Sequence, residues 1–134
     1  MTVVVGWTPD ARGHAALLRG AREALAHRED LLVVNATTGT AAVDDRFAAD
    51  SDVTDVQALL ESLGVEAQVR QAVVRDVPGE LVAIADEVGA SLLVIGIRHR
   101  SPVGKLLLGS TAQRILLDAR CPVLAVKAAE APGR

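Results

Sequence analysis

Short apolar runs alternate with amphipathic helical segments along this chain of 134 residues, and this alternation constrains the fold more than any other feature. Continuous apolar runs, typical of strands covered on both faces, occur at about residues 3–5, 31–34, 92–95 and 122–126. The segment 65–73 begins with strict alternation of apolar and polar residues, which predicts an edge strand with one face toward solvent. Five strands are therefore expected.

Four helices are predicted between these strands, because apolar residues recur there at a spacing of three and four. They are expected at about residues 10–27, 51–63, 78–88 and 110–119. The apolar stripes of the last two helices predict that four residues lie in the core and make no ligand contacts: Leu81, Ile84, Ile115 and Leu116.

Strands that alternate with helices form right-handed crossovers and a mostly parallel sheet. The sequence thus predicts an α/β fold with one doubly wound sandwich, in which five strands take the order 3-2-1-4-5. One domain is expected over residues 1–134, with a loose tail at 128–134. In this order the winding reverses between the first and fourth strands, and a ligand crevice is expected at their carboxyl ends.

Composition excludes several function classes. Three His and one Cys at unrelated spacings argue against a metal cluster. With one Trp, one Phe and a net charge of −3, the chain has neither the aromatic platforms nor the positive charge of a nucleic-acid-binding protein. We expect a cytoplasmic protein, because the sequence has neither a secretory leader nor a membrane-length apolar run. The chain also lacks G-x-S-x-G and Walker A motifs, so no enzyme activity is predicted.

A candidate phosphate site follows the fourth predicted strand. The next helix opens on Gly109, Ser110 and Thr111, and the first backbone N–H groups of a helix form an anion site. The preceding loop is basic and includes Arg98 and His99. The alternative interpretation is a solvated basic loop followed by an ordinary helix cap.

Gly96-Ile-Arg-His99, nine further residues and then Gly109-Ser110 resemble the G-x2-G-x9-G-[ST] motif of ATP-binding members of the universal stress protein family. The segments 100–110 and 121–126 are also similar to this family, and the resemblance covers nearly the whole chain. It implies an adenine-nucleotide alpha-hydrolase-like fold. It also implies ATP or another adenine nucleotide as the ligand, and no metal site belonging to the protein itself.

The resemblance also implies roles for single residues. Gly96 would lie under the ribose, Gly109 and Ser110 would hold the phosphates, and Ala36 and Ile95 would flank the adenine. The predicted binding residues are Thr8, Ala36, Ile95, Gly96, Arg98, His99, Gly109, Ser110 and Thr111.

This chain departs from the family pattern at two of these positions. Thr8 stands where the family usually has an acidic residue, and His99 stands where the motif has its second glycine. The His99 side chain either occupies space that the phosphates need or pairs with them when it is protonated. Asp10 is interpreted as a helix cap, or as a replacement for the missing carboxylate. Trp7 is interpreted as a lid or as a plug of the cleft.

Two functions remain open at this point. The first is a stress-response regulator whose adenine-nucleotide site has a modified form. The second is a dimeric interaction module on the same fold that does not bind nucleotide. The resemblance implies a homodimer that pairs through the last strand, Pro122 to Val126, and an uncovered apolar edge strand favours such pairing.

Overall fold

A computed structural model of the chain describes residues 1–38, 49–97 and 108–128. Within these ranges, five strands form one sheet in the order β3-β2-β1-β4-β5, and all four pairings are parallel. The strands are β1 (Thr2–Gly6), β2 (Asp30–Thr37), β3 (Ala67–Val73), β4 (Ala90–Ile97) and β5 (Val123–Lys127). The predicted fold class and strand order are confirmed.

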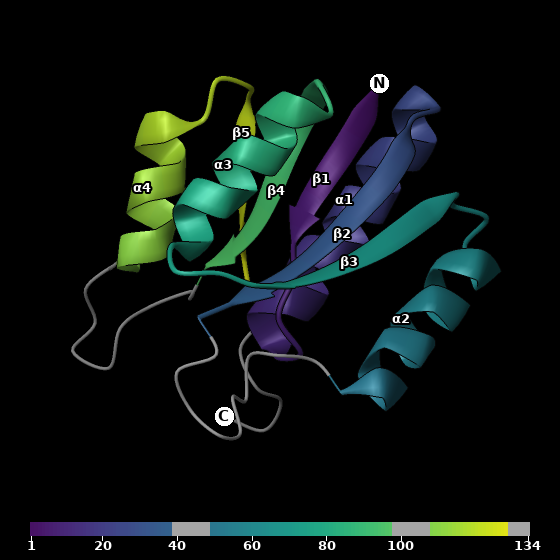
Figure 1. The fold of residues 1–134 in the computed structure, drawn as a ribbon. Helices are drawn as coiled ribbons and strands as arrows, with labels where there is room; N and C mark the ends of the chain where they lie inside the picture. Colours follow the sequence, from purple (N-terminus) through teal and green to yellow (C-terminus); the bar gives the residue numbers. More distant parts are fainter. Residues whose placement is uncertain (39–48, 98–107, 129–134) are drawn as a thin grey trace.

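Helices cover both faces of this sheet. The described helices are α1 (Ala11–His27), α2 (Asp50–Ser62), α3 (Val77–Glu87) and α4 (Ser110–Asp118). Figure 1 shows α3 and α4 side by side in front of the sheet, with α1 behind it. Val56 and Leu60 of α2 pack in the same core cluster as Leu17 of α1, which places α2 on the α1 face. The sheet is therefore the middle layer of a three-layer sandwich.

The core consists of two apolar clusters, one on each face of the sheet. Strand β1 contributes to both, because successive side chains of a strand point to opposite faces. Val3 and Val5 belong to the cluster under α1 and α2, whereas Val4 belongs to the cluster under α3 and α4. All three have 0% exposure. Burial on both faces explains why the central strands have continuous apolar runs.

Three of the four predicted core residues in α3 and α4 are buried, and one is not. Leu81, Ile84 and Ile115 are at most 4% exposed, but Leu116 is 41% exposed. Helix α4 has nine residues and buries only Ala112 and Ile115. Leu116 is about 100° around the helix from Ile115, at the margin of this narrow stripe. The prediction that Leu116 is a core residue is therefore wrong.

The first residue of the predicted loose tail is fixed to the sheet. Ala128 is 8% exposed, and its backbone N–H donates to the carbonyl of Ile97 at 2.9 Å. This bond continues the pairing between β4 and β5 by one residue. Residues 129–134 lie outside the described residues.

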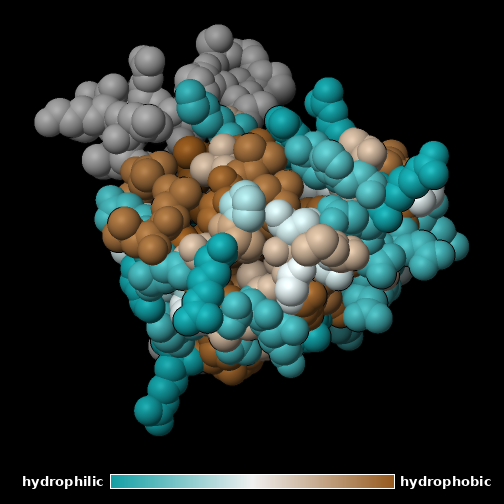
Figure 2. All heavy atoms as spheres, turned by 90° about the horizontal axis from the view of Figure 1, so that it is seen from above, coloured by the Kyte–Doolittle hydropathy of each residue, from teal (hydrophilic) through white to brown (hydrophobic). Residues whose placement is uncertain are grey.

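The surface carries both hydrophobic and hydrophilic side chains (Figure 2). Seen from above, hydrophobic side chains gather on one part of the molecule, and hydrophilic side chains cover most of the rest (Figure 2). Apolar exposure also occurs on α4, where Leu117 is 83% exposed. In the described part of the chain, every helix is too short or too polar to cross a membrane.

Candidate functional site

A cavity of about 670 Å³ opens where the carboxyl ends of β1, β2 and β4 meet. The turn after β1 and the first turns of α1, α3 and α4 complete its wall. Strands β1 and β4 are neighbours in the sheet but far apart in the sequence, so the winding direction reverses between them. Open parallel sheets bind their ligands at such a point.

Seven of the nine predicted binding residues border this one cavity. They are Thr8, Ala36, Ile95, Gly96, Gly109, Ser110 and Thr111. The other two, Arg98 and His99, lie outside the described residues. The fold thus brings the turn after β1, the end of β2 and the Gly109 segment together, while the ligand contacts of these residues stay a prediction.

One end of the cavity is apolar. Its wall includes Val34, Ala36, Leu81 and Ile95, all of which also belong to the core cluster under α3 and α4. Ile115 has the same double role. Leu81 and Ile115 are core residues, as predicted, and they also border the cavity because this core cluster is open at the carboxyl edge of the sheet. Whether they contact a ligand there stays a prediction. A flat apolar group fits between such side chains.

The first turn of α4 forms another part of the wall. Gly109 is the N-cap residue of this helix, with φ −61° and ψ 161°. Because glycine has no side chain to accept from the first helical N–H groups, Gly109 leaves them available to a ligand. The partial positive charge of a helix start also favours an anion. Ser110 and Thr111 add two hydroxyl groups beside it.

Three arginines and one aspartate line the cavity, and the sequence did not reveal them. Arg114 of α4 pairs with Asp76, the N-cap residue of α3, with Nη1 and Oδ1 2.5 Å apart. The hydrogen bond from Arg114 lowers the pKa of Asp76. Arg12 pairs with Asp10, whereas Arg75 has no ion-pair partner among the residues that the structure describes. The net positive charge favours an anionic ligand.

Close backbone packing explains two glycines at the site. A Cβ at Gly96 would overlap the carbonyl oxygen of Arg12, in the first turn of α1. A Cβ at Gly13 would likewise overlap the carbonyl oxygen of Thr8. The start of α1 therefore lies directly against the end of β4 and against the turn after β1.

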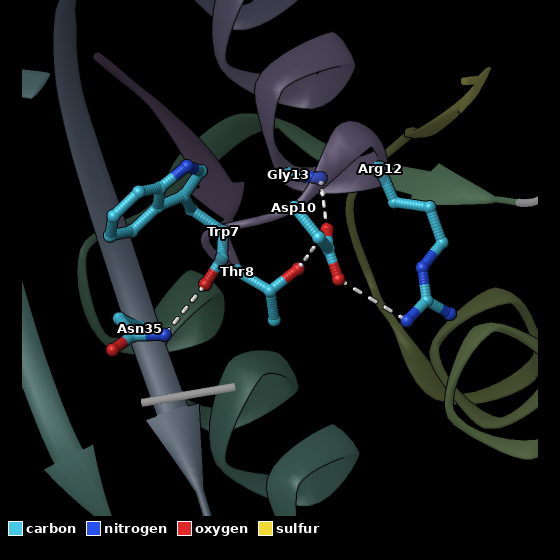
Figure 3. Close-up of polar contacts among 6 residues, drawn as sticks. All are labelled: Trp7, Thr8, Asp10, Arg12, Gly13 and Asn35. Atoms are coloured by element: carbon cyan, nitrogen blue, oxygen red, sulfur yellow. Dashed lines mark hydrogen bonds and ion pairs between the residues drawn. The ribbon is translucent and has the colours of Figure 1, made fainter. Parts of the chain in front are cut away.

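A buried polar side chain fixes the turn after β1. Asn35 of β2 has 0% exposure, and its Nδ2 donates to the carbonyl oxygen of Trp7 at 2.9 Å (Figure 3). Gln71 of β3 donates in turn to Asn35 Oδ1 at 3.2 Å. The Trp7 indole packs in the core cluster under α1 and α2. It lies on the opposite face of the sheet from the apolar wall, so the indole does not fill that part of the cavity, although Trp7 is among the residues that border the cavity.

Asp10 is a helix cap, as the first of its two interpretations predicted. Its Oδ1 accepts from the backbone N–H of Gly13 at 2.9 Å and from the Thr8 hydroxyl at 2.7 Å. Arg12 Nη2 lies 3.4 Å from Oδ2 (Figure 3). Burial raises the pKa of Asp10, but the two hydrogen bonds and Arg12 outweigh burial and lower it. Thr8 and Arg12 border the cavity, whereas Asp10 is not among the described residues that line it.

The described residues include no cluster of His, Cys, Asp and Glu side chains that could hold a metal ion. What they do provide is an apolar wall, a helix start and an excess of positive charge around one space. This combination suits an amphipathic anion with a flat apolar part.

Comparison with known proteins gives a consistent result. A model of the Universal stress protein family matches residues 1–127. A "Universal stress protein" of Mycolicibacterium smegmatis is 54% identical over 125 residues, which cover 93% of this chain and 96% of that protein. A solved universal stress protein of Archaeoglobus fulgidus has a TM-score of 0.82 and 32% identity, covering 95% of this chain and 98% of that one. A second solved universal stress protein structure from A. fulgidus, in complex with dAMP, has a TM-score of 0.69 and 26% identity, covering 95% of this chain and 98% of that one.

Proposed function

Because the chain belongs to the universal stress protein family, we propose that it is a cytoplasmic regulatory protein that binds ATP or another adenine nucleotide. The nucleotide would occupy the cavity at the carboxyl ends of β1 and β4. One observation carries this proposal. An apolar wall suited to a base and a helix start suited to phosphates face the same space of about 670 Å³.

The A. fulgidus protein in complex with dAMP supports this proposal by similarity. Its ligand is an adenine nucleotide, and its fold matches 95% of this chain. We propose binding without rapid hydrolysis, since the sequence contains no Walker A lysine. Nucleotide occupancy would then act as the signal.

The first prediction concerns His99, where the family motif has glycine. We expect His99→Gly to raise the affinity for ATP about tenfold or more, equivalent to about 1.4 kcal/mol, because removal of the imidazole lets the backbone approach the phosphates. Isothermal titration calorimetry of wild type and variant at pH 6 and pH 8 measures this change.

The opposite outcome has a distinct signature. If His99 is itself a phosphate ligand, His99→Gly weakens binding, and wild-type affinity falls as pH rises through about 6.5, the ordinary imidazole pKa. Absence of ATP binding by both proteins, together with absence of nucleotide in heat-released extracts of freshly purified protein, would contradict the proposed function.

A second proposal is a homodimer that pairs through β5. This strand lies at one end of the described sheet, and Leu124 and Val126 are only half-buried there. An edge strand leaves one row of N–H and C=O groups without a neighbour in the sheet, and a second copy can supply one. If nucleotide binding is absent, this pairing is the basis of the interaction module.

We therefore expect Leu124→Asp to convert a dimer into a monomer or an aggregate, because a charge in an apolar interface must lose its hydration. The matched control is Val73→Asp on β3, at the other end of the described sheet, where Val73 is 63% exposed. Light scattering at micromolar concentration gives the mass, and circular dichroism checks folding. A wild-type monomer, or a Leu124→Asp dimer, would contradict the proposal.

A further inference from the structure

An ion pair joins α3 and α4 at the wall of the cavity. Asp76 is the N-cap residue of α3, and its carboxylate accepts from the Arg114 guanidinium of α4. Both residues line the cavity, and the two helices lie side by side (Figure 1). The Arg114 side chain is 48% exposed and the Asp76 side chain 50%. Because water solvates both charges when such a pair separates, the pair can open at little cost.

Arg114 belongs to the same part of the cavity as the start of α4. Ser110 is the first residue of this helix, and Arg114 lies four residues later, so the two share one face of the helix. Long side chains in a helix point back toward its N-terminus, which brings the guanidinium toward the first turn. The N–H groups and the partial positive charge of that turn favour an anion. An anion held there is therefore within the range of Arg114 as well.

Asp76 competes with such an anion for one guanidinium. Its Oδ1 takes Arg114 Nη1, and carboxylate and phosphate oxygens accept from a guanidinium in the same way. Two anions beside one guanidinium would also repel each other. The Asp10 carboxylate differs, because Gly13 and Thr8 hold it in place and it is not among the described residues that line the cavity.

On this basis, and resting on the proposed function, we propose that Asp76 is an internal competitor of the ligand, which occupies Arg114 until the anionic group of the ligand displaces it. Arg114 then exchanges a partner on α3 for one on the ligand, and the link between the two helices opens as the ligand binds. Asp76 thus sets the affinity for the anionic part of the ligand and leaves the affinity for its uncharged part unchanged.

The test measures the affinity of wild type and Asp76→Asn for ATP and for adenosine by isothermal titration calorimetry. The substitution removes the competing charge, and Asn is as good an N-cap residue as Asp, so α3 keeps its start. We expect the variant to bind ATP about two- to fivefold more tightly, the range that an exposed ion pair accounts for. The affinity for adenosine, which has no phosphate, should not change.

Asp118→Asn is the matched control. Asp118 also approaches Arg114, with Oδ2 3.8 Å from Nη2, but it is not among the described residues that line the cavity. This variant removes the same charge from a second partner of the same guanidinium. Its affinity for ATP should stay at the wild-type value, because Asp118 does not stand where the ligand binds.

A double-mutant cycle tests whether Asp76 acts through Arg114. Arg114→Gln removes the guanidinium and should weaken ATP binding about tenfold. When Asp76→Asn is added to Arg114→Gln, it should give no further gain, since the group for which Asp76 competes is absent. Melting curves of all variants verify that they are folded.

The outcomes are distinguishable. If wild type binds ATP and Asp76→Asn binds it no more tightly, the pair is only a link between helices, and this inference is overturned while the proposed function stands. An equal gain in Asp118→Asn, or the same gain in the Arg114→Gln background, would overturn it too, because the effect would then be one of overall charge. If neither wild type nor Asp76→Asn binds ATP, the proposed function is overturned and this inference with it.

Discussion

Replacement of Ile84 by Ala is expected to lower the free energy of unfolding by about 2 to 5 kcal/mol. Ile84 lies in α3 at 3% exposure, packed in the cluster between that helix and the sheet. Removal of its outer carbons loses their transfer free energy and leaves a cavity that a close-packed interior only partly fills. Urea denaturation followed by circular dichroism measures the change. Ile84 does not border the ligand cavity among the residues described there, so the loss is one of stability.

The matched control is Leu117→Ala in α4, where the side chain is 83% exposed. A change away from buried contacts is expected to stay within about 0.5 kcal/mol. Equal denaturation midpoints for wild type and Ile84→Ala would show that α3 presents a different face to the sheet. A loss in Leu117→Ala as large as that in Ile84→Ala would show that α4 is covered by a partner in solution.

The order of elements was predictable because burial on two faces gives a distinct pattern. Each apolar run at the centre of β1, β2 and β4 contains no polar residue, which indicates a strand buried on both faces. The helices that connect these strands require the strands to be parallel. Strand ends were not predictable in this way. β2 continues to Thr37 because its backbone pairs with β3 as far as Val73, whatever the polarity of the side chains. Asn35 is buried there because its amide has partners at Trp7 and Gln71.

The candidate site was predictable where strand ends and helix starts define it. Gly96 is the last residue but one of β4, Gly109 is the N-cap residue of α4, and the sheet order places both at the cavity. The Asp76–Arg114 pair joins two helix starts that are far apart in the sequence, and it arises only because α3 and α4 pack side by side (Figure 1). No periodicity of the sequence reports such a contact. The position of Leu81 in the cavity wall could not be predicted either, since residues of a cavity wall and residues of a core have the same apolar pattern in the sequence.

Replacement by Ala is expected to lower stability at Gly96 but not at Gly109, and to weaken nucleotide binding at both. At Gly96 a Cβ would overlap the Arg12 carbonyl oxygen, and a backbone atom cannot move aside unless α1 moves with it. We expect Gly96→Ala to lower the free energy of unfolding by about 1 to 3 kcal/mol or more. Because Gly96 and Arg12 both border the cavity, the shift should also abolish nucleotide binding.

At Gly109 no atom of the described residues beyond its chain neighbours lies within 4 Å of an added Cβ, and φ is −61°, which any residue adopts. We expect Gly109→Ala to leave stability within about 0.5 kcal/mol of wild type. Its added methyl group would nevertheless stand at the helix start where the proposed function places phosphates, so ATP affinity should fall about tenfold or more. Denaturation and calorimetry on both variants separate the two roles. If Gly109→Ala binds ATP as tightly as wild type, the phosphates lie elsewhere. If Gly96→Ala is as stable as wild type, α1 and β4 are not in close contact at this point.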